Sequence, residues 1–230
     1  MKKLVFVAVA SLAIAAVAYT PQQVGVTTFT PTTQNAIVPV AFKSLSDGTS
    51  AVSPKDLVKT TNLDDDTWLI AVINGAYSSW KLQGGEWTSA IYSTPLVQGM
   101  TAGANETTLT AGSAIWIIFP STPKQVTIYG APASGVTSTI AANAATLVGN
   151  PLQTEATISV TPATGDEIVI PKSDNDSSAD RYVYRTNKSG TVSEWRLDGA
   201  SATLPSIGVG QGFWYIRKGA ATTLSWAEEN

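Results

Sequence analysis

The chain contains neither cysteine nor histidine, and this limits the chemistry that its side chains can perform. Histidine is the commonest general base and metal ligand near neutral pH, so triads, dyads and metal sites built on His or Cys are excluded. Ser78-Ser79-Trp80-Lys81 has the S-x-x-K spacing of penicillin-recognising serine enzymes. That spacing brings Lys to Ser only on a helix, and we expect a strand here, so we interpret the match as chance.

Paired carboxylates remain as candidate catalysts, because glycosidases need only two. None of the available acids stands in a recognisable motif, and an unrepeated strand carboxylate such as Glu194 is typical of a solvated face. We therefore predict that the protein is not an enzyme. The acids considered are Asp64, Asp65, Asp66, Glu86, Asp166, Glu167 and Glu194.

The segment from Asp174 to Asp180 is the candidate metal site. Asp174, Asp176 and Asp180 offer the oxygen ligands that calcium prefers. The segment lacks the turn glycine and the distal glutamate of the helical calcium loop, and Arg185 stands where that glutamate would be. A hydrated acidic turn is the alternative interpretation. We expect no other cofactor.

Three aromatic residues are candidates for binding a ligand or partner, namely Trp87, Tyr92 and Trp226. Trp87 and Tyr92 fall in a stretch that the second half of the chain shortens, and loop aromatics often serve in recognition. The alternative is that Trp87 covers the core between the halves, because large apolar side chains prefer burial.

The N-terminus has the pattern of a bacterial secretory signal peptide. Lys2 and Lys3 precede an apolar run, and Ala16-Val17-Ala18 forms a small-x-small cleavage site. A retained membrane anchor is the alternative, but the run is short for a span. We therefore expect residues 1–18 to be removed and the protein to be secreted, periplasmic or at the cell surface, with no membrane span after cleavage.

Internal repetition is the main clue to the fold. The stretch from Gly25 to Phe42 aligns without a gap with the stretch from Gly135 to Leu152, and such repeats define the architecture when they are real. Two shorter matches follow, of 79–84 with 194–199 and of 111–118 with 209–216. We expect two tandem copies of one β unit, sandwich or barrel-like and related by a pseudo-two-fold or a translation, over residues 19–130 and 131–230.

Short apolar runs punctuated by Pro, Gly, Asn and Asp predict strands throughout. The expected strands are 25–30, 36–42, 67–73, 78–82, 113–119, 125–129, 136–140, 146–148, 181–185, 192–197, 212–217 and 222–226. One short helix is expected near 53–58, where Ser53-Pro54 is typical of a helix start. Gly84-Gly85 is typical of a tight hairpin, and 208–212 is expected to be a turn rather than a phosphate loop.

Four tryptophans recur with an apolar neighbour two residues away, which places each pair on one face of a strand. They are Trp80, Trp116, Trp195 and Trp214. We expect all four to be mostly buried, with Lys81 and Arg196 pointing outward. Sugar stacking is the alternative role for such rings.

Leu147-Val148-Gly149-Asn150-Pro151 and the closing Gly210-Gln211-Gly212-Phe213-Trp214 resemble motifs of secreted bacterial β-repeat surface proteins, which are mostly uncharacterised. The resemblance covers nearly the whole chain after the signal peptide. It implies a surface or secreted β protein, without catalytic residues.

These observations predict a secreted structural or interaction protein of the cell surface or extracellular matrix. A carbohydrate-binding module using exposed aromatics is the alternative. The chain is acidic, with a net charge of −3, and has no run of basic residues, which argues against nucleic acid. We expect a protein or polysaccharide partner, and residues 19–30 are the segment through which a homo-oligomer could form.

Overall fold

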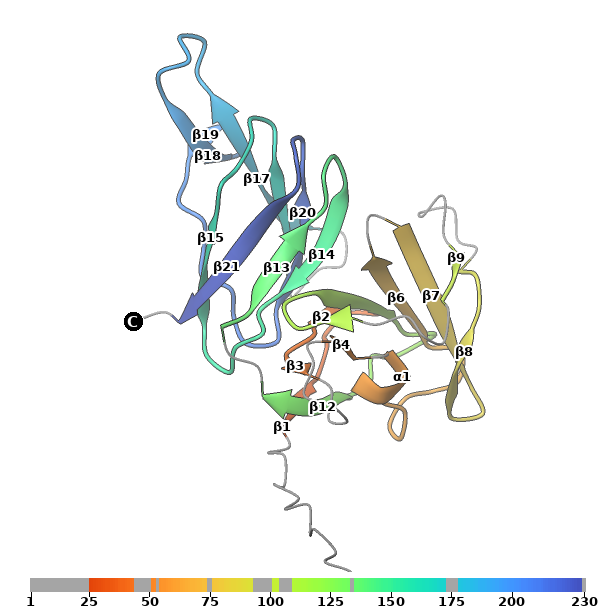
Figure 1. Ribbon diagram of the computed structural model, residues 1–230. Coiled ribbons are helices and arrows are strands. Elements are labelled where there is room, and N and C mark those ends of the chain that lie inside the picture. The colour runs from red at the N-terminus through yellow and green to blue at the C-terminus, as the bar shows by residue number, and fades with distance from the viewer. Residues whose placement is uncertain are drawn as a thin grey trace, which may run out of the picture.

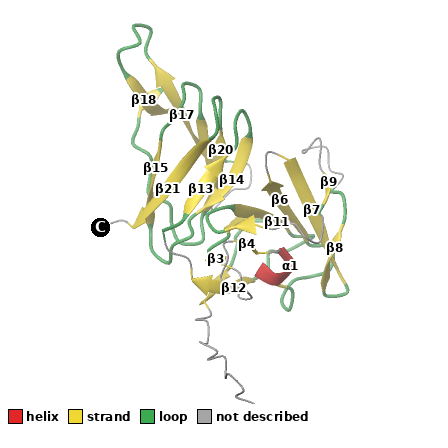
Figure 2. Ribbon diagram, in the orientation of Figure 1, coloured by secondary structure: helices red, strands yellow, loops and turns green. Residues whose placement is uncertain are grey.

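A computed structural model describes residues 25–43, 51–52, 54–73, 76–92, 101–103, 109–132, 135–172 and 178–228. Over these ranges the protein is all-β, and the single helix there, α1 (Pro54–Leu57), is four residues long (Figure 2). The expected signal peptide, residues 1–18, lies outside the described residues. None of the described helical structure is long and apolar enough to cross a membrane.

The first half contains two main sheets and a short strand pair. The larger sheet is formed by β2 (Asn35–Pro39), β6 (Trp68–Ile73), β7 (Ala76–Gln83), β8 (Glu86–Ser89), β9 (Thr101–Ala102) and β11 (Ala114–Ile118). The smaller sheet is formed by β1 (Gly25–Phe29), β3 (Phe42–Lys43), β5 (Val58–Lys59) and β12 (Val126–Pro132). The separate pair is β4 (Ala51–Val52) and β10 (Leu109–Thr110).

The second half also contains two sheets. The larger is formed by β14 (Ala145–Gly149), β16 (Glu167–Pro171), β17 (Ala179–Thr186), β18 (Ser193–Leu197), β19 (Ala200–Ser201) and β20 (Gly212–Ile216). The smaller is formed by β13 (Thr137–Ile140), β15 (Ala156–Val160) and β21 (Thr222–Glu228). The strand orders of the two larger sheets are β2-β11-β6-β7-β8 and β14-β20-β16-β17-β18-β19.

In each half, residues from both sheets contribute to one buried apolar cluster. In the first half, Ile117 of β11 and Leu69 of β6 meet Ile128 of β12, and all three are fully buried. In the second half, Tyr215 of β20 and Ile168 of β16 meet Leu224 of β21, again with no exposed surface. Alternation of side chains along each strand directs these residues to the inner face.

The helix and hairpin predictions are confirmed where the structure describes them. The helix lies at Pro54–Leu57, within the expected 53–58. Gly84 and Gly85, with φ of 61° and 83°, connect β7 to β8. This is the positive-φ pair that a tight two-residue hairpin requires.

Several strands lie outside the ranges expected from the sequence, namely β4, β5, β8, β9, β10, β15, β16 and β19. The clearest are β8, β15 and β16, which are well-formed partners in their sheets. β8 and β15 contain charged or small polar residues that weaken the apolar alternation. β16 is apolar and alternates in burial, so its pattern was there to be recognised.

The prediction that the four tryptophans are mostly buried is confirmed: Trp80 is 3 % exposed, and Trp116, Trp195 and Trp214 are only partly exposed and pack against buried clusters. In β11 and β20 the fully buried inner face carries Ile115 and Ile117 in one strand and Phe213 and Tyr215 in the other. Trp116 and Trp214 therefore point to the opposite face, where the two halves of the chain meet.

The sequence match of 79–84 with 194–199 aligns residues that occupy different strands in their sheets. Trp80 lies on β7, the first strand of its hairpin, and pairs with Ser89 on β8. Trp195 lies on β18, the second strand of its hairpin, and pairs with Tyr184 on β17. Both tryptophans precede a glycine turn, so the shared sequence reflects similar turn chemistry at successive hairpins rather than one position in the sheet.

The two halves lie side by side and meet along β2 and β14 (Figure 1). Val72, Ala114 and Leu147 are buried between them, with Ile37, Trp116 and Trp214 packed against them. Ser113 forms a β-bridge with Val148, and Gly112 O accepts hydrogen bonds from Gly149 N at 3.2 Å and Ser138 Oγ at 2.7 Å. A small apolar cluster and a few backbone contacts thus join the halves.

Two glycines allow this close contact. A Cβ on Gly149 would lie 2.5 Å from Pro39 Cβ and 2.6 Å from Pro39 Cα, and a Cβ on Gly212 would lie 2.4 Å from Ile37 Cγ2. Both distances are far below van der Waals contact. Glycine at these positions is therefore required for the halves to meet as they do.

Substitution of Gly149 by Ala should lower the free energy of unfolding by about 1–3 kcal/mol, because the added methyl meets Pro39 backbone that cannot move aside cheaply. Urea unfolding followed by circular dichroism measures this change. Gly208→Ala is the matched control, since its Cβ would meet only Gln211 Oε1 at 3.6 Å. Equal effects of the two substitutions would contradict the close docking.

Candidate functional site

A cleft of about 730 Å³ opens between the two halves. Its apolar floor includes Trp116 of β11 and Trp214 of β20, whose ring centroids are 6.3 Å apart with the planes at 85°. Tyr77 of β7 stacks against Trp214 at 6.1 Å. The cleft is of the size that small-molecule and oligomeric ligands occupy, and its floor is built from both halves.

The walls of the cleft are rich in uncharged polar groups. One wall comes from β1, the following turn and β2, and the other from the loop before β20, together with Pro171 and Lys172. Hydroxyl and amide side chains on these walls belong to Thr28, Thr30, Thr32, Thr33, Asn35 and Gln211. Aromatic faces combined with hydroxyl and amide groups can bind a ligand that has both apolar and hydrogen-bonding surface.

The loop from Gly208 to Gln211 forms a turn, as expected from the sequence. Gln211 N donates to Gly208 O at 3.1 Å, and Gly208 N donates to Gln211 Oε1 at 3.0 Å. Gly210 has φ of 79°, and a Cβ there would overlap the ring of Phe29. The turn therefore holds the second-half wall of the cleft against a side chain of the first half.

Asn150 fixes this loop from below. It has no exposed surface, and its Nδ2 donates to Ile207 O and Thr154 O at 2.8 Å each. Its Oδ1 accepts from Leu152 N at 2.8 Å. Gly149 and Asn150, the centre of the motif noted in the sequence, thus have structural roles: close contact between halves for one, anchoring of the cleft loop for the other.

The three predicted binding aromatics do not form one site. Trp87 on β8 is 8 % exposed and its Nε1 donates to Val58 O at 3.3 Å, so its ring lies in the first core. Tyr92 packs edge-on against Trp68 at 5.0 Å. Trp226, in the other half, packs against Phe213 at 6.0 Å and donates to Ser138 Oγ. Trp87 is thus a core residue, as the alternative expected, but of the first half and not of the contact between the halves.

The predicted calcium segment lies mostly outside the described residues, including Asp174 and Asp176. Asp180 is described, on β17, and forms an ion pair with Lys172 Nζ at 3.0 Å. Among the residues that the structure describes, no three acidic side chains gather as a metal site would require.

A second hollow, of about 560 Å³, lies on the β17–β18 hairpin. Arg181 and Arg185 of β17 border it together with Lys188 of the hairpin turn and Arg196 of β18. The sequence contains no run of basic residues, but antiparallel pairing places Arg185 opposite Glu194 and Val183 opposite Arg196. Sequence reasoning missed this cluster because its members are spread over both strands of a hairpin.

The S-x-x-K pattern does not form a serine–lysine pair. Ser78 and Lys81 are three residues apart on β7 and so point to opposite faces of the sheet. Lys81 Nζ instead contacts Asp66 Oδ1 at 2.6 Å. Ser79, which is buried, donates from its hydroxyl to Ala90 O at 2.6 Å.

Asp166 is the most deeply buried ionised group in the described part of the chain. It lies just before β16, and its Oδ2 accepts from Arg217 Nη1 at 2.6 Å and Tyr215 Oη at 2.8 Å. Oδ2 also accepts from Ala163 N at 2.9 Å, and Oδ1 accepts from Lys218 N at 2.7 Å. The carboxylate is thus saturated with donors.

The protonation of this cluster follows from its contacts. Burial by itself would raise the pKa of Asp166, but the hydrogen bonds from Ala163, Lys218, Tyr215 and Arg217 outweigh it, so the net pKa is lowered. Burial and the contact with Asp166 raise the pKa of Tyr215 above its ordinary value. An ionised Asp166 surrounded by donors and closed to solvent holds strands together and offers no access to a substrate.

The comparisons with known proteins give no family: no family model, no curated protein and no solved structure matches the chain. The candidate sites therefore depend on geometry alone.

Asp166→Asn should lower the free energy of unfolding by about 3–5 kcal/mol at neutral pH, because Arg217 would be left buried without its counter-charge. In the intact protein the lowered pKa means that the unfolded chain binds more protons below about pH 4. Stability is then complete above that pH and is lost as the pH falls through the folded pKa. Urea midpoints measured from pH 2 to pH 7 test this.

The matched control for this prediction is Asp64→Asn, since Asp64 forms only an exposed ion pair with Lys124 at 3.5 Å, which contributes little. A stability profile that is the same in both variants would show that Asp166 does not hold the second half together.

Proposed function

We propose that the protein is an exported, non-catalytic interaction protein of the cell surface or extracellular matrix, which recognises its ligand in the cleft between its halves. The observation that carries the proposal is the exposure of Trp116 and Trp214 on a shared floor. Part of each ring packs between the halves and the rest borders the cleft, and partly exposed aromatic rings in a cleft are typical of binding sites. The sequence pattern for export supports the location.

The ligand class that best fits the cleft is an uncharged carbohydrate. Tryptophan faces bind the apolar face of a sugar ring, and the threonine, asparagine and glutamine groups of the walls match its hydroxyls. Lys172 is the only charged residue that borders the cleft among the described residues. The proposal is therefore a form of the carbohydrate-binding alternative in which Trp116 and Trp214 bind the sugar, in place of Trp87, Tyr92 and Trp226.

We also propose that the two halves are copies of one β unit. The matching strand orders support this, as does the equivalent setting of the cleft tryptophans: Trp116 pairs across to Ile37 and Ile70, and Trp214 to Leu147 and Val169. On this proposal the cleft lies where two equivalent faces meet. Duplication then created the binding site, because one unit alone supplies half of the floor.

Trp214→Ala should weaken glycan binding about tenfold or more, as loss of a central aromatic contact does at binding hot spots. The probes are neutral oligomers of β-1,4-glucose, β-1,3-glucose and β-1,4-N-acetylglucosamine, followed by tryptophan fluorescence and calorimetry. Trp226→Phe is the control, because Trp226 does not border the cleft. If none of these probes binds, or if both variants lose affinity equally, the cleft is not a carbohydrate site.

We also propose that any self-association of the protein through residues 19–30 takes place at one strand of that segment, β1. Residues 19–24 lie outside the described residues, while β1 pairs with β12 of its own sheet from Gly25 to Phe29. β1 is at the edge of that sheet, and Val26 on it is 58 % exposed. An exposed edge strand with an apolar side chain is the usual route to pairing between chains.

If β1 mediates self-association, Val26→Lys should convert any oligomer of the mature protein to monomer, because a charge on an edge strand opposes edge-to-edge pairing. Light scattering after size-exclusion chromatography gives the mass. Val192→Lys is the control, at an equally apolar position that is 51 % exposed in a hairpin turn. An oligomer that persists in the Val26 variant excludes this route.

A further inference from the structure

The hollow on the β17–β18 hairpin is bordered by Arg181, Arg185, Lys188 and Arg196 and by one carboxylate, Asp198, so cations outnumber acids along its edge. Arg181 contacts Glu167 at 2.9 Å and Arg196 contacts Glu194 at 2.9 Å. Arg185 and Lys188 are exposed and form no ion pair with any described residue. The chain as a whole is acidic, so this hairpin is a local exception that an anion would find by electrostatic attraction.

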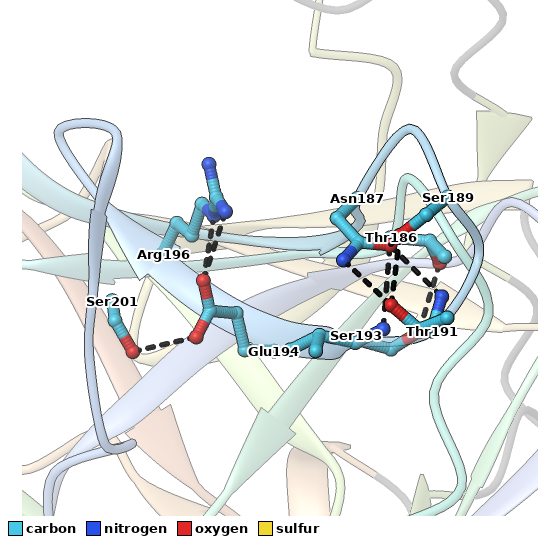
Figure 3. A network of polar contacts seen from close by, with 9 residues as sticks. Thr186, Asn187, Ser189, Thr191, Ser193, Glu194, Arg196 and Ser201 are labelled. Carbon is cyan, nitrogen blue, oxygen red and sulfur yellow. Dashed lines mark hydrogen bonds and ion pairs between the residues drawn. The ribbon is translucent and has the colours of Figure 1, made fainter.

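Glu194 would be the natural partner of Arg185, because the two are directly opposite each other in the sheet. Its carboxylate instead contacts Arg196 and Ser201 (Figure 3): Oε1 accepts from Arg196 Nε at 3.0 Å and Oε2 accepts from Ser201 Oγ at 2.8 Å. These hydrogen bonds from Ser201 and Arg196 also lower the pKa of Glu194. The carboxylate of Glu194 is therefore already engaged by Arg196 and Ser201.

The turn that carries Lys188 is held in one shape. Asn187 Oδ1 accepts from Thr191 N at 2.9 Å and Ser189 Oγ at 3.0 Å, and Asn187 Nδ2 donates to Thr191 Oγ1 at 3.0 Å (Figure 3). Thr186 and Ser193 add a hydroxyl contact of 3.0 Å across the strands. Such an organised turn lowers the entropy that a ligand must remove on binding.

We propose that this hollow binds an acidic polysaccharide through its carboxylates, with Arg185 and Lys188 as the principal contacts. The hollow joins cationic groups to a turn rich in hydroxyl and amide groups, which matches a chain of sugar acids. The aromatic side chains of the hairpin, Tyr184 and Trp195, stack on each other at 5.3 Å and lie on the face opposite to Arg185 and Arg196. Bases of a single-stranded nucleic acid would find no ring to stack on in the hollow.

This site goes beyond the cleft, with which it shares no residue. The hairpin extends away from the first half at the upper end of the second (Figure 1). Loss of one site therefore leaves the other intact, and the two proposals can fail separately.

The test uses the mature protein and a hexamer of α-1,4-galacturonate, with its fully methyl-esterified form as the neutral counterpart, measured by calorimetry at low salt. The acidic hexamer should bind and the ester should not, and added salt should weaken the binding. Arg185→Gln/Lys188→Gln should weaken it about tenfold or more, because each lost contact is a charge-assisted hydrogen bond. Lys59→Gln/Lys124→Gln removes the same charge from the first half and should change the affinity by no more than about twofold.

Circular dichroism and melting curves establish that both double variants are folded, which their exposed positions favour. The proposal is overturned if the acidic hexamer does not bind at millimolar concentration, if the ester binds equally well, or if the two double variants behave alike. Tighter binding of a single-stranded DNA of equal charge would also overturn it, and would assign the hollow to nucleic acid.

Discussion

The two halves of the protein touch where no side chain can fit between them, and the rest of the structure depends on that contact. Gly149 lies against Pro39, and Gly212 lies against Ile37. This brings β14 and β20 close enough to β2 and β11 for Val72, Ala114 and Leu147 to be buried together. The same docking sets Trp116 against Trp214 and opens the cleft beside them. A protein without disulfide bonds, as the absence of cysteine requires here, relies on such packing to fix the position of one half relative to the other.

The ends of the central strands are stabilised by different chemistry in the two halves. Just before β16 and just after β20, the second half buries Asp166 and Arg217 in an ion pair that Tyr215 completes. Just before β6 and just after β11, the first half buries Thr67 and Phe119 instead. A buried ion pair is no more stabilising than good apolar packing but is costly to break. The stability of the second half should therefore fall at acid pH, through protonation of Asp166.

The sequence predicted most of the strands with regular apolar alternation, the short helix and the glycine turns, because these follow from local chemistry. It did not predict the faces of β11 and β20. Alternation alone assigns Trp116 and Trp214 to a core, whereas these central strands are covered on both sides, by the core of their own half on one face and by the other half on the second. Periodicity shows that two faces differ but not which neighbour covers each. The hairpin cations were missed for a related reason: the register that joins Arg185 and Arg196 is a property of pairing, not of spacing along the chain.

The distribution of charge argues that the two candidate surfaces serve different ligands. The cleft is bordered by hydroxyl and amide groups around aromatic rings, with Lys172 at its edge already engaged by Asp180. The hairpin hollow contains cations and no available ring. A single extended chain that carried both neutral and acidic sugars could reach both surfaces, and binding at one would then raise the effective concentration at the other. Rigid docking of the halves through Gly149 is the condition for that gain, because two sites on freely moving halves would present no fixed spacing to a polymer.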